Sequence, residues 1–155
     1  MILLPHMLIG AAIGAKIHSA IAVFVFSIIS HFIADKLPHW EYLDKELSDY
    51  RSTKEFLMVF MKIALDFGLG AILLFYFFQR SPDWPYVAIG ALSAVLPDFF
   101  VFLNWLFPRI KILEKYRDFH HRNHVHRKYH QEKVLSVFSE GTVILLALYL
   151  VIRQL

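Results

Sequence analysis

The sequence predicts an all-α polytopic membrane protein, a single membrane domain of about five short helices, and three observations predict this class. Hydrophobic residues make up 57% of the 155 residues, against roughly 45–50% in soluble domains. The mean hydropathy is +0.50. Long runs such as 63–78 and 143–152 carry few or no charges and lack the alternation typical of strands. Because backbone groups in lipid must be hydrogen-bonded internally, such runs indicate helices.

The first apolar region, residues 2–37, is longer than the roughly 20 residues that one span needs, and a polar group at 16–19 interrupts it. We interpret it as a hairpin with helices at about 5–17 and 19–36, the second ended by Pro38. No basic segment precedes it and no small-residue cleavage site follows it, so it is not interpreted as a signal peptide.

A second hairpin is predicted next. Ser52 is followed three residues later by Glu55, the spacing of a capping box, so a third helix starts there and runs to about Gln79. The residues at 80–85 include two prolines and end this helix. A fourth helix is expected at about 86–96.

The remaining chain divides into a basic, histidine-rich segment at 108–133 and a last helix at about 132–153. The basic segment carries eight Lys or Arg against three acids, a formal charge of +5. Beside a membrane it is expected to bind anionic lipid headgroups, with about 1 kcal/mol from each basic side chain. Nucleic acid is disfavoured as a partner because stacking aromatics are sparse there.

Two similar units suggest an internal repeat, at about 4–40 and 55–100. Each unit contains two ionisable residues at corresponding positions: His6 and His39 in the first, Asp66 and Asp98 in the second. These pairs are separated by 33 and 32 residues, respectively. Internal duplication is common in membrane proteins and often places sites at the repeat interface. Chance similarity between apolar segments is the alternative.

If both units are hairpins, these four residues lie toward one membrane face, together with segments 36–55 and 108–133. That face carries twelve Lys or Arg, whereas the opposite face has Lys16, Arg80 and Arg153. The positive-inside rule then predicts that the crowded face is cytoplasmic.

His31 and Asp35 are four residues apart and share a helix face, and His39 follows just beyond a proline. With no cysteine in the chain, any metal site must use nitrogen and oxygen ligands. This set suits a divalent metal, zinc first, with manganese or iron as alternatives. The simpler interpretation is a histidine hydrogen-bonded to a carboxylate at a helix end.

Three further acids are candidates. Asp66 lies in an apolar run, where an unpartnered carboxylate costs roughly 2.5 kcal/mol or more, and an ion pair with Lys62 is its alternative. Asp98 follows a Leu-Pro helix stop, where a turn or cap is the alternative. Glu140 lies in the last helix, where a hydrogen bond between helices is the alternative.

Five histidines crowd residues 120–130: His120, His121, His124, His126 and His130. The first and third of these are one helical turn apart, which favours a metal site over a solvated basic tract or adventitious metal binding. The hairpin topology brings the candidates from distant parts of the chain toward one face. The predicted metal ligands are His6, His31, Asp35, His39, Asp66, Asp98, His120, His121 and His124, and the predicted catalytic acids are Asp35 and Glu140.

Three motifs resemble a family of small bacterial and archaeal inner-membrane proteins called membrane-bound metal-dependent hydrolases. They are His6 with Gly10, the stretch from Ser30-His31-Phe32 through Asp35 to Leu37-Pro38-His39-Trp40, and Leu96-Pro97-Asp98. The resemblance covers most of the chain. It implies that His6, His39, Asp98 and the late histidines are metal ligands.

Three functions therefore compete. The first is a membrane-embedded hydrolase that acts on a lipid or lipid-linked substrate, in which metal lowers the pKa of bound water. A carboxylate such as Asp35 or Glu140 would act as its general base. The second is a di-iron oxidase or hydroxylase with histidine boxes. The third is a non-enzymatic membrane scaffold or transport component. The sequence leaves the substrate and the oligomeric state open.

Overall fold

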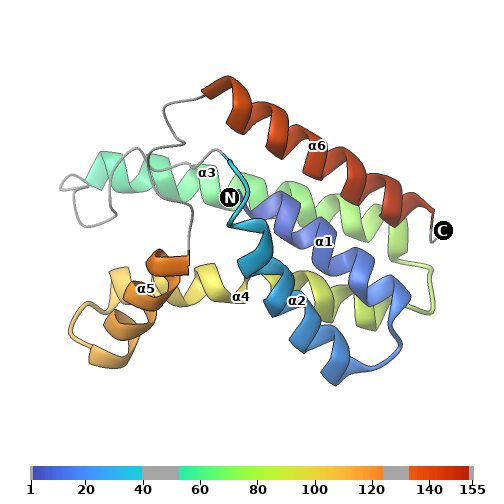
Figure 1. Ribbon diagram of the computed structural model, residues 1–155, viewed down its shortest axis with the longest axis horizontal. Coiled ribbons are helices and arrows are strands. Elements are labelled where there is room, and N and C mark those ends of the chain that lie inside the picture. Colours follow the sequence, from blue (N-terminus) through green and yellow to red (C-terminus); the bar gives the residue numbers. More distant parts are fainter. Residues whose placement is uncertain (1, 40–52, 124–132, 154–155) are drawn as a thin grey trace.

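The computed structural model describes residues 2–39, 53–123 and 133–153, which form helices and no strands. The helices are α1 (Leu3–Lys16), α2 (Ala20–Ala34), α3 (Thr53–Phe78), α4 (Trp84–Leu106), α5 (Lys111–Asn123) and α6 (Lys133–Ile152) (Figure 1). The all-α class is confirmed, but the predicted number of about five helices is wrong because the described ranges contain six.

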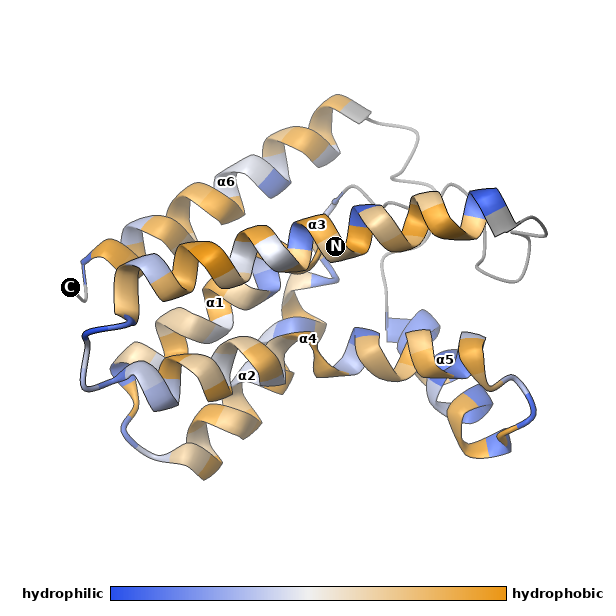
Figure 2. Cartoon of the chain, turned by 180° about the vertical axis from the view of Figure 1, so that it is seen from behind, coloured by the Kyte–Doolittle hydropathy of each residue, from blue (hydrophilic) through white to orange (hydrophobic). Residues whose placement is uncertain are grey.

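Three helices, α3, α4 and α6, are long and apolar enough to cross a membrane. Most residues of these three spans are not buried against the rest of the chain. Figure 2 shows hydrophobic colouring along most of α3. Helices α1 and α2 have only 14 and 15 residues. At a rise of about 1.5 Å per residue they are shorter than the roughly 30 Å hydrocarbon core. These two short apolar helices pack against the longer ones.

Helix α4 does not end at Leu96 as predicted. It continues to Leu106 with Pro97 inside it, so Asp98 lies within a helix and not in a turn after one. Proline removes one amide donor, which normally breaks a helix. Helices of membrane proteins tolerate it because neighbouring groups satisfy the freed carbonyls. The longer α4 carries Asp98 alongside α2 and α5.

Helix α5 lies in the basic segment, to which the sequence analysis assigned no secondary structure. Its inner side follows helical spacing, with half-buried Leu113 and Tyr116 followed by buried His120. Exposed Lys111 and Lys115 lie on other sides of the same helix. Despite its many charges, this segment forms an amphipathic helix, and the inner side of the helix packs against α4.

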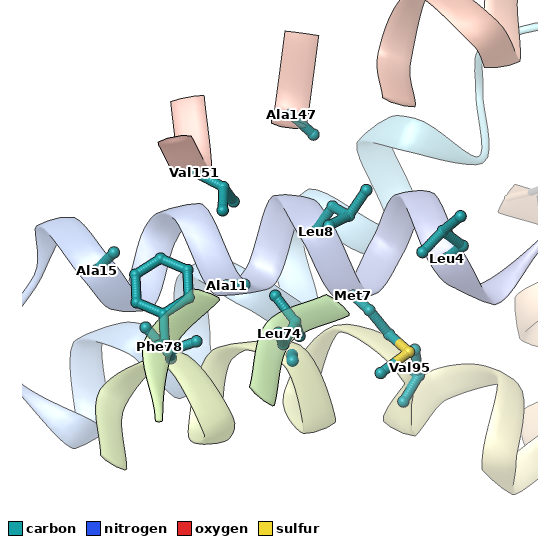
Figure 3. Close-up of a cluster of buried hydrophobic side chains, with 12 residues drawn as sticks. Leu4, Met7, Leu8, Ala11, Ala15, Leu74, Phe78, Val95, Ala147 and Val151 are labelled. Carbon is teal, nitrogen blue, oxygen red and sulfur yellow. The ribbon is translucent and has the colours of Figure 1, made fainter. Parts of the chain in front are cut away.

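Helix α1 is central and contacts α2, α3, α4 and α6. Figure 3 shows its apolar side chains between those of α3, α4 and α6. Its contact with α4 is a backbone contact, because a Cβ added to Gly10 would lie 2.2 Å from the carbonyl oxygen of Gly90. One turn later, a Cβ on Gly14 would lie 2.1 Å from the carbonyl oxygen of Tyr86. Small residues at this spacing let membrane helices approach closely.

The turns after α1 and α3 lie at one end of the molecule, where exposed His18 donates from Nε2 to Asp83 Oδ1 at 2.9 Å. The two helix pairs differ in length, with 14 and 15 residues in the first and 26 and 23 in the second. The internal repeat stays a prediction. The Ser52 part of the predicted capping box lies outside the described residues.

Candidate metal centre

Four side chains from three helices meet near the end of α2 that lies away from His18. They are His31 and Asp35 at the end of α2, Asp98 in α4 and His120 in α5, and each offers one ligand atom within 4.8 Å of all the others. His31, Asp35 and His120 are buried, while the side chain of Asp98 is 26% exposed. Residues 31, 35, 98 and 120 were all predicted ligands, and the structure brings them together.

The separations between these atoms match a single metal ion. His31 Nε2 lies 3.0 Å from His120 Nε2, 3.0 Å from Asp35 Oδ2 and 3.7 Å from Asp98 Oδ1. His120 Nε2 lies 3.5 Å from Asp35 Oδ2 and 3.4 Å from Asp98 Oδ1. Ligands at about 2.0–2.1 Å on a tetrahedral zinc are about 3.3–3.5 Å apart. The donor set and its spacing therefore fit a zinc-sized divalent cation.

A backbone hydrogen bond orients the His31 ring. His31 Nδ1 donates to the carbonyl oxygen of Ala94 at 2.8 Å, and this contact is buried. Because a carbonyl only accepts, the neutral ring must carry its proton on Nδ1 and present the lone pair of Nε2 to the other three side chains. Metal-binding histidines are usually fixed in this way by a partner on the far nitrogen. Ala94 belongs to α4, so the helix that carries Asp98 also orients the His31 ring.

The charges of the cluster also call for a cation. Asp35 is 1% exposed and Asp98 is three-quarters buried, so two carboxylates share a site largely removed from water. Buried carboxylates need a compensating positive charge. Either a divalent ion or protonated histidines can supply it, and removing metal from the purified protein distinguishes the two.

His6 of α1 lies beside this four-residue group. It is 1% exposed, its Nε2 lies 3.2 Å from Asp35 Oδ1, and its ring stacks on His31 with centroids 4.2 Å apart. Asp35 therefore has a histidine facing each of its oxygens.

His39 and His121, two other predicted ligands, are not among the four residues of this group. His39 is buried, and its Nδ1 donates to the carbonyl oxygen of Leu37 at 2.7 Å. His121 is exposed, and its ring lies edge-on to that of His120. Their roles as ligands stay predictions. His124 lies outside the described residues, as do His126 and His130.

Asp66 and Glu140 hold the start of α1. Asp66 Oδ2 accepts a hydrogen bond from the Leu4 amide at 3.0 Å, and Glu140 Oε1 accepts one from the Ile2 amide at 3.2 Å. The first amides of a helix lack partners within it, and the helix dipole favours negative charge there. These hydrogen bonds explain in structural terms why two acidic residues occur within the membrane domain. Their predicted metal-binding and catalytic roles stay predictions.

We expect Asp66→Ala to lower the free energy of unfolding by about 1 kcal/mol, the usual effect of losing a helix cap. Asp66→Asn keeps an acceptor oxygen and is expected to lose less. Denaturation in detergent micelles measures both, with bound metal determined on the same samples. If folded Asp66→Ala loses its metal, Asp66 belongs to the metal centre.

Two contacts near the centre have no signal in the sequence. Buried Asn104 of α4 accepts a hydrogen bond through Oδ1 from Arg117 Nη1 at 3.3 Å, which ties α4 to the turn of α5 before His120. The ring of Tyr116 lies 6.4 Å from that of His120. Burial raises the pKa of Tyr116 to about 12, with Asp98 and Asp35 adding to the effect. Its phenol therefore stays protonated and can donate a hydrogen bond beside the centre.

Comparisons of the chain with protein-family models, curated proteins and solved structures found no match. The resemblance to membrane-bound metal-dependent hydrolases stays a prediction, and function is inferred from the side chains of the site.

Proposed function

We propose that this protein is a membrane-embedded, metal-dependent hydrolase that acts on a lipid or lipid-linked, phosphorylated substrate. One observation carries the proposal: the ligand atoms of two histidines and two aspartates, from three helices, lie within 4.8 Å of one another. A bound divalent ion would polarise a phosphoryl group and lower the pKa of a water molecule. Zinc is the metal proposed, with manganese or iron as alternatives.

The more exposed side of the centre suits an amphiphilic substrate. Asp98 has the most exposed side chain of the four proposed ligands. Next to it on α4, Phe99 is 50% exposed and Phe100 is 37% exposed. Phe119 of α5 is 46% exposed. These aromatic rings would contact an acyl or prenyl chain while a headgroup reaches the ion.

Helix α5, which carries the proposed ligand His120, also carries exposed basic side chains such as Lys111 and Lys115. Amphipathic helices with basic side chains bind at membrane surfaces rich in anionic lipid. We propose that segment 108–133 holds anionic headgroups near the centre. By the positive-inside rule this side is cytoplasmic, in the inner membrane of a prokaryote.

The first test is metal content. Protein purified in detergent and dialysed against metal-free buffer is expected to retain one tightly bound zinc, manganese or iron ion per chain. Asp98→Asn and His120→Ala are expected to retain none because the first removes the negative charge of a ligand and the second removes a ligand. His18→Ala is the matched control, since this histidine also contacts an aspartate but lies near the other end of α2. Its metal content is expected to equal that of the wild type.

Two outcomes would contradict the proposal. If folded wild-type protein contained no metal, or if both ligand variants retained their metal, the metal-dependent hydrolase would be ruled out. The non-enzymatic membrane scaffold would then be favoured. Bound iron with oxygen-dependent turnover would favour the oxidase. If metal binds as expected, release of phosphate or headgroup from vesicles containing phosphatidic acid and phosphatidylglycerol tests hydrolysis, with the Asp98→Asn variant as the inactive control.

A further inference from the structure

His6 is a buried imidazole that the four-residue centre does not use. It is 1% exposed, and within the part of the chain that the structure describes neither ring nitrogen has a hydrogen-bond partner of good geometry. Buried polar groups are nearly always satisfied, so an exception needs an explanation. A ligand bound by the ring is one.

The position of Asp35 indicates where that ligand would bind. His6 Nε2 lies 3.2 Å from Asp35 Oδ1, yet the ring is not aligned for a hydrogen bond to this oxygen. Two side chains that bind the same cation also lie close together without being aligned for a hydrogen bond to each other. Each lone pair points at the ion, not at the other ligand, and two ligands about 2.1 Å from one ion lie roughly 3.0 Å apart in octahedral and 3.4 Å apart in tetrahedral geometry.

Asp35 has its other oxygen in the first centre. Asp35 Oδ2 faces His31 at 3.0 Å and His120 at 3.5 Å, whereas Oδ1 faces His6. The rings of His6 and His31 are stacked with an interplanar angle of 29° and centroids 4.2 Å apart. Ions bound by these two rings would lie side by side, at a spacing close to the roughly 3.5–4 Å of two-metal sites.

We propose that a second divalent cation binds between His6 Nε2 and Asp35 Oδ1, so that Asp35 bridges two metal ions. The proposal rests on the metal centre proposed above and makes it binuclear. Among the described residues two side chains face this second position, fewer than the four proposed for the first ion. The second ion is therefore expected to bind more weakly and to fill its other positions with water or substrate oxygens.

A binuclear centre also narrows the substrate class. Two adjacent ions stabilise the attacking and leaving oxygens of a phosphoryl transfer. The tetrahedral oxygens of a phosphate ester can reach both ions. We therefore expect a phosphoester of a lipid or lipid-linked molecule, and we expect inorganic phosphate to strengthen binding of the second ion.

Titration of metal-free, full-length protein in detergent with Mn²⁺ tests the second site. Calorimetry is expected to show a tight and a weaker binding event in the wild type, and paramagnetic resonance is expected to show coupled Mn²⁺ pairs. In His6→Ala the weaker event and the coupling are expected to disappear. Loss of affinity should exceed the roughly 10–100-fold that removal of an outer-shell partner causes. His6→Asn keeps a ligand oxygen and should bind with intermediate affinity.

The outcomes separate the two proposals. A single binding event in the wild type would overturn the proposed second site but would agree with the four-residue metal centre. No binding at all would overturn both. Two events in His6→Ala would show that His6 is not a ligand of the second ion. If both His6 variants lost the tight binding event, His6 would belong to the first metal centre. The proposed second metal site would then be overturned.

Discussion

Gly10→Val is expected to destabilise the protein by about 3 kcal/mol and to weaken binding of the proposed second metal ion. The Cβ of any residue here would lie 2.2 Å from the carbonyl oxygen of Gly90 and 2.6 Å from its carbonyl carbon. These are backbone atoms of α4, so no side chain can rotate away, and the two helices must separate. Helix α1 carries His6, so separation from α4 would also displace this ligand of the proposed second ion.

Gly68→Ala and Gly141→Ala are matched controls for this change. A Cβ at either position would meet nothing within 4 Å. Replacing such a helical glycine with alanine is expected to be neutral or to stabilise by up to about 1 kcal/mol. Denaturation with increasing sodium dodecyl sulfate in mixed micelles would measure all three variants. A Gly10→Val protein as stable as the controls would show that α1 and α4 do not pack as the structure describes.

The sequence located most of the helices because their apolar runs are separated by polar turns. The predicted helices at 5–17, 19–36 and 132–153 agree with α1, α2 and α6 within a few residues. One local signal was misleading. Pro97 was interpreted as a helix stop, whereas α4 continues through it because packing against neighbouring helices overrides the local effect of proline. The sequence left the conformation of segment 108–133 unassigned, and the structure describes α5 within it.

The site could be predicted in part. His31 and Asp35 are paired by the helical period, which is a local property that the sequence contains. Their meeting with Asp98 and His120 depends on helix rotation, on the crossing of α2 with α4 and on the helical state of α5, none of which can be derived from spacing. The partners of Asp66 and Glu140 are backbone amides of α1. Because every residue except proline has such an amide, no residue type marks them.

Asp35→Asn is expected to remove all bound metal and to make folding independent of metal. Asparagine has nearly the same volume and keeps one oxygen, but it loses the charge that faces three histidines between 3.0 and 3.5 Å away. In the metal-free protein this change should cost little, because an uncompensated buried charge is itself destabilising. In the wild type, zinc at about 1,000 times its dissociation constant should stabilise the fold by about 4 kcal/mol.

Thermal unfolding in detergent, with and without zinc, measures this difference. Asp83→Asn is the matched control because Asp83 also faces a histidine, at 2.9 Å, but near the opposite end of α2. It should keep the full response to zinc, whereas Asp35→Asn should show none. If Asp35→Asn were stabilised by zinc as strongly as the wild type, Asp35 would not be a ligand. The histidines around it would then be a hydrogen-bonded network, in which protonated imidazoles compensate the buried carboxylates.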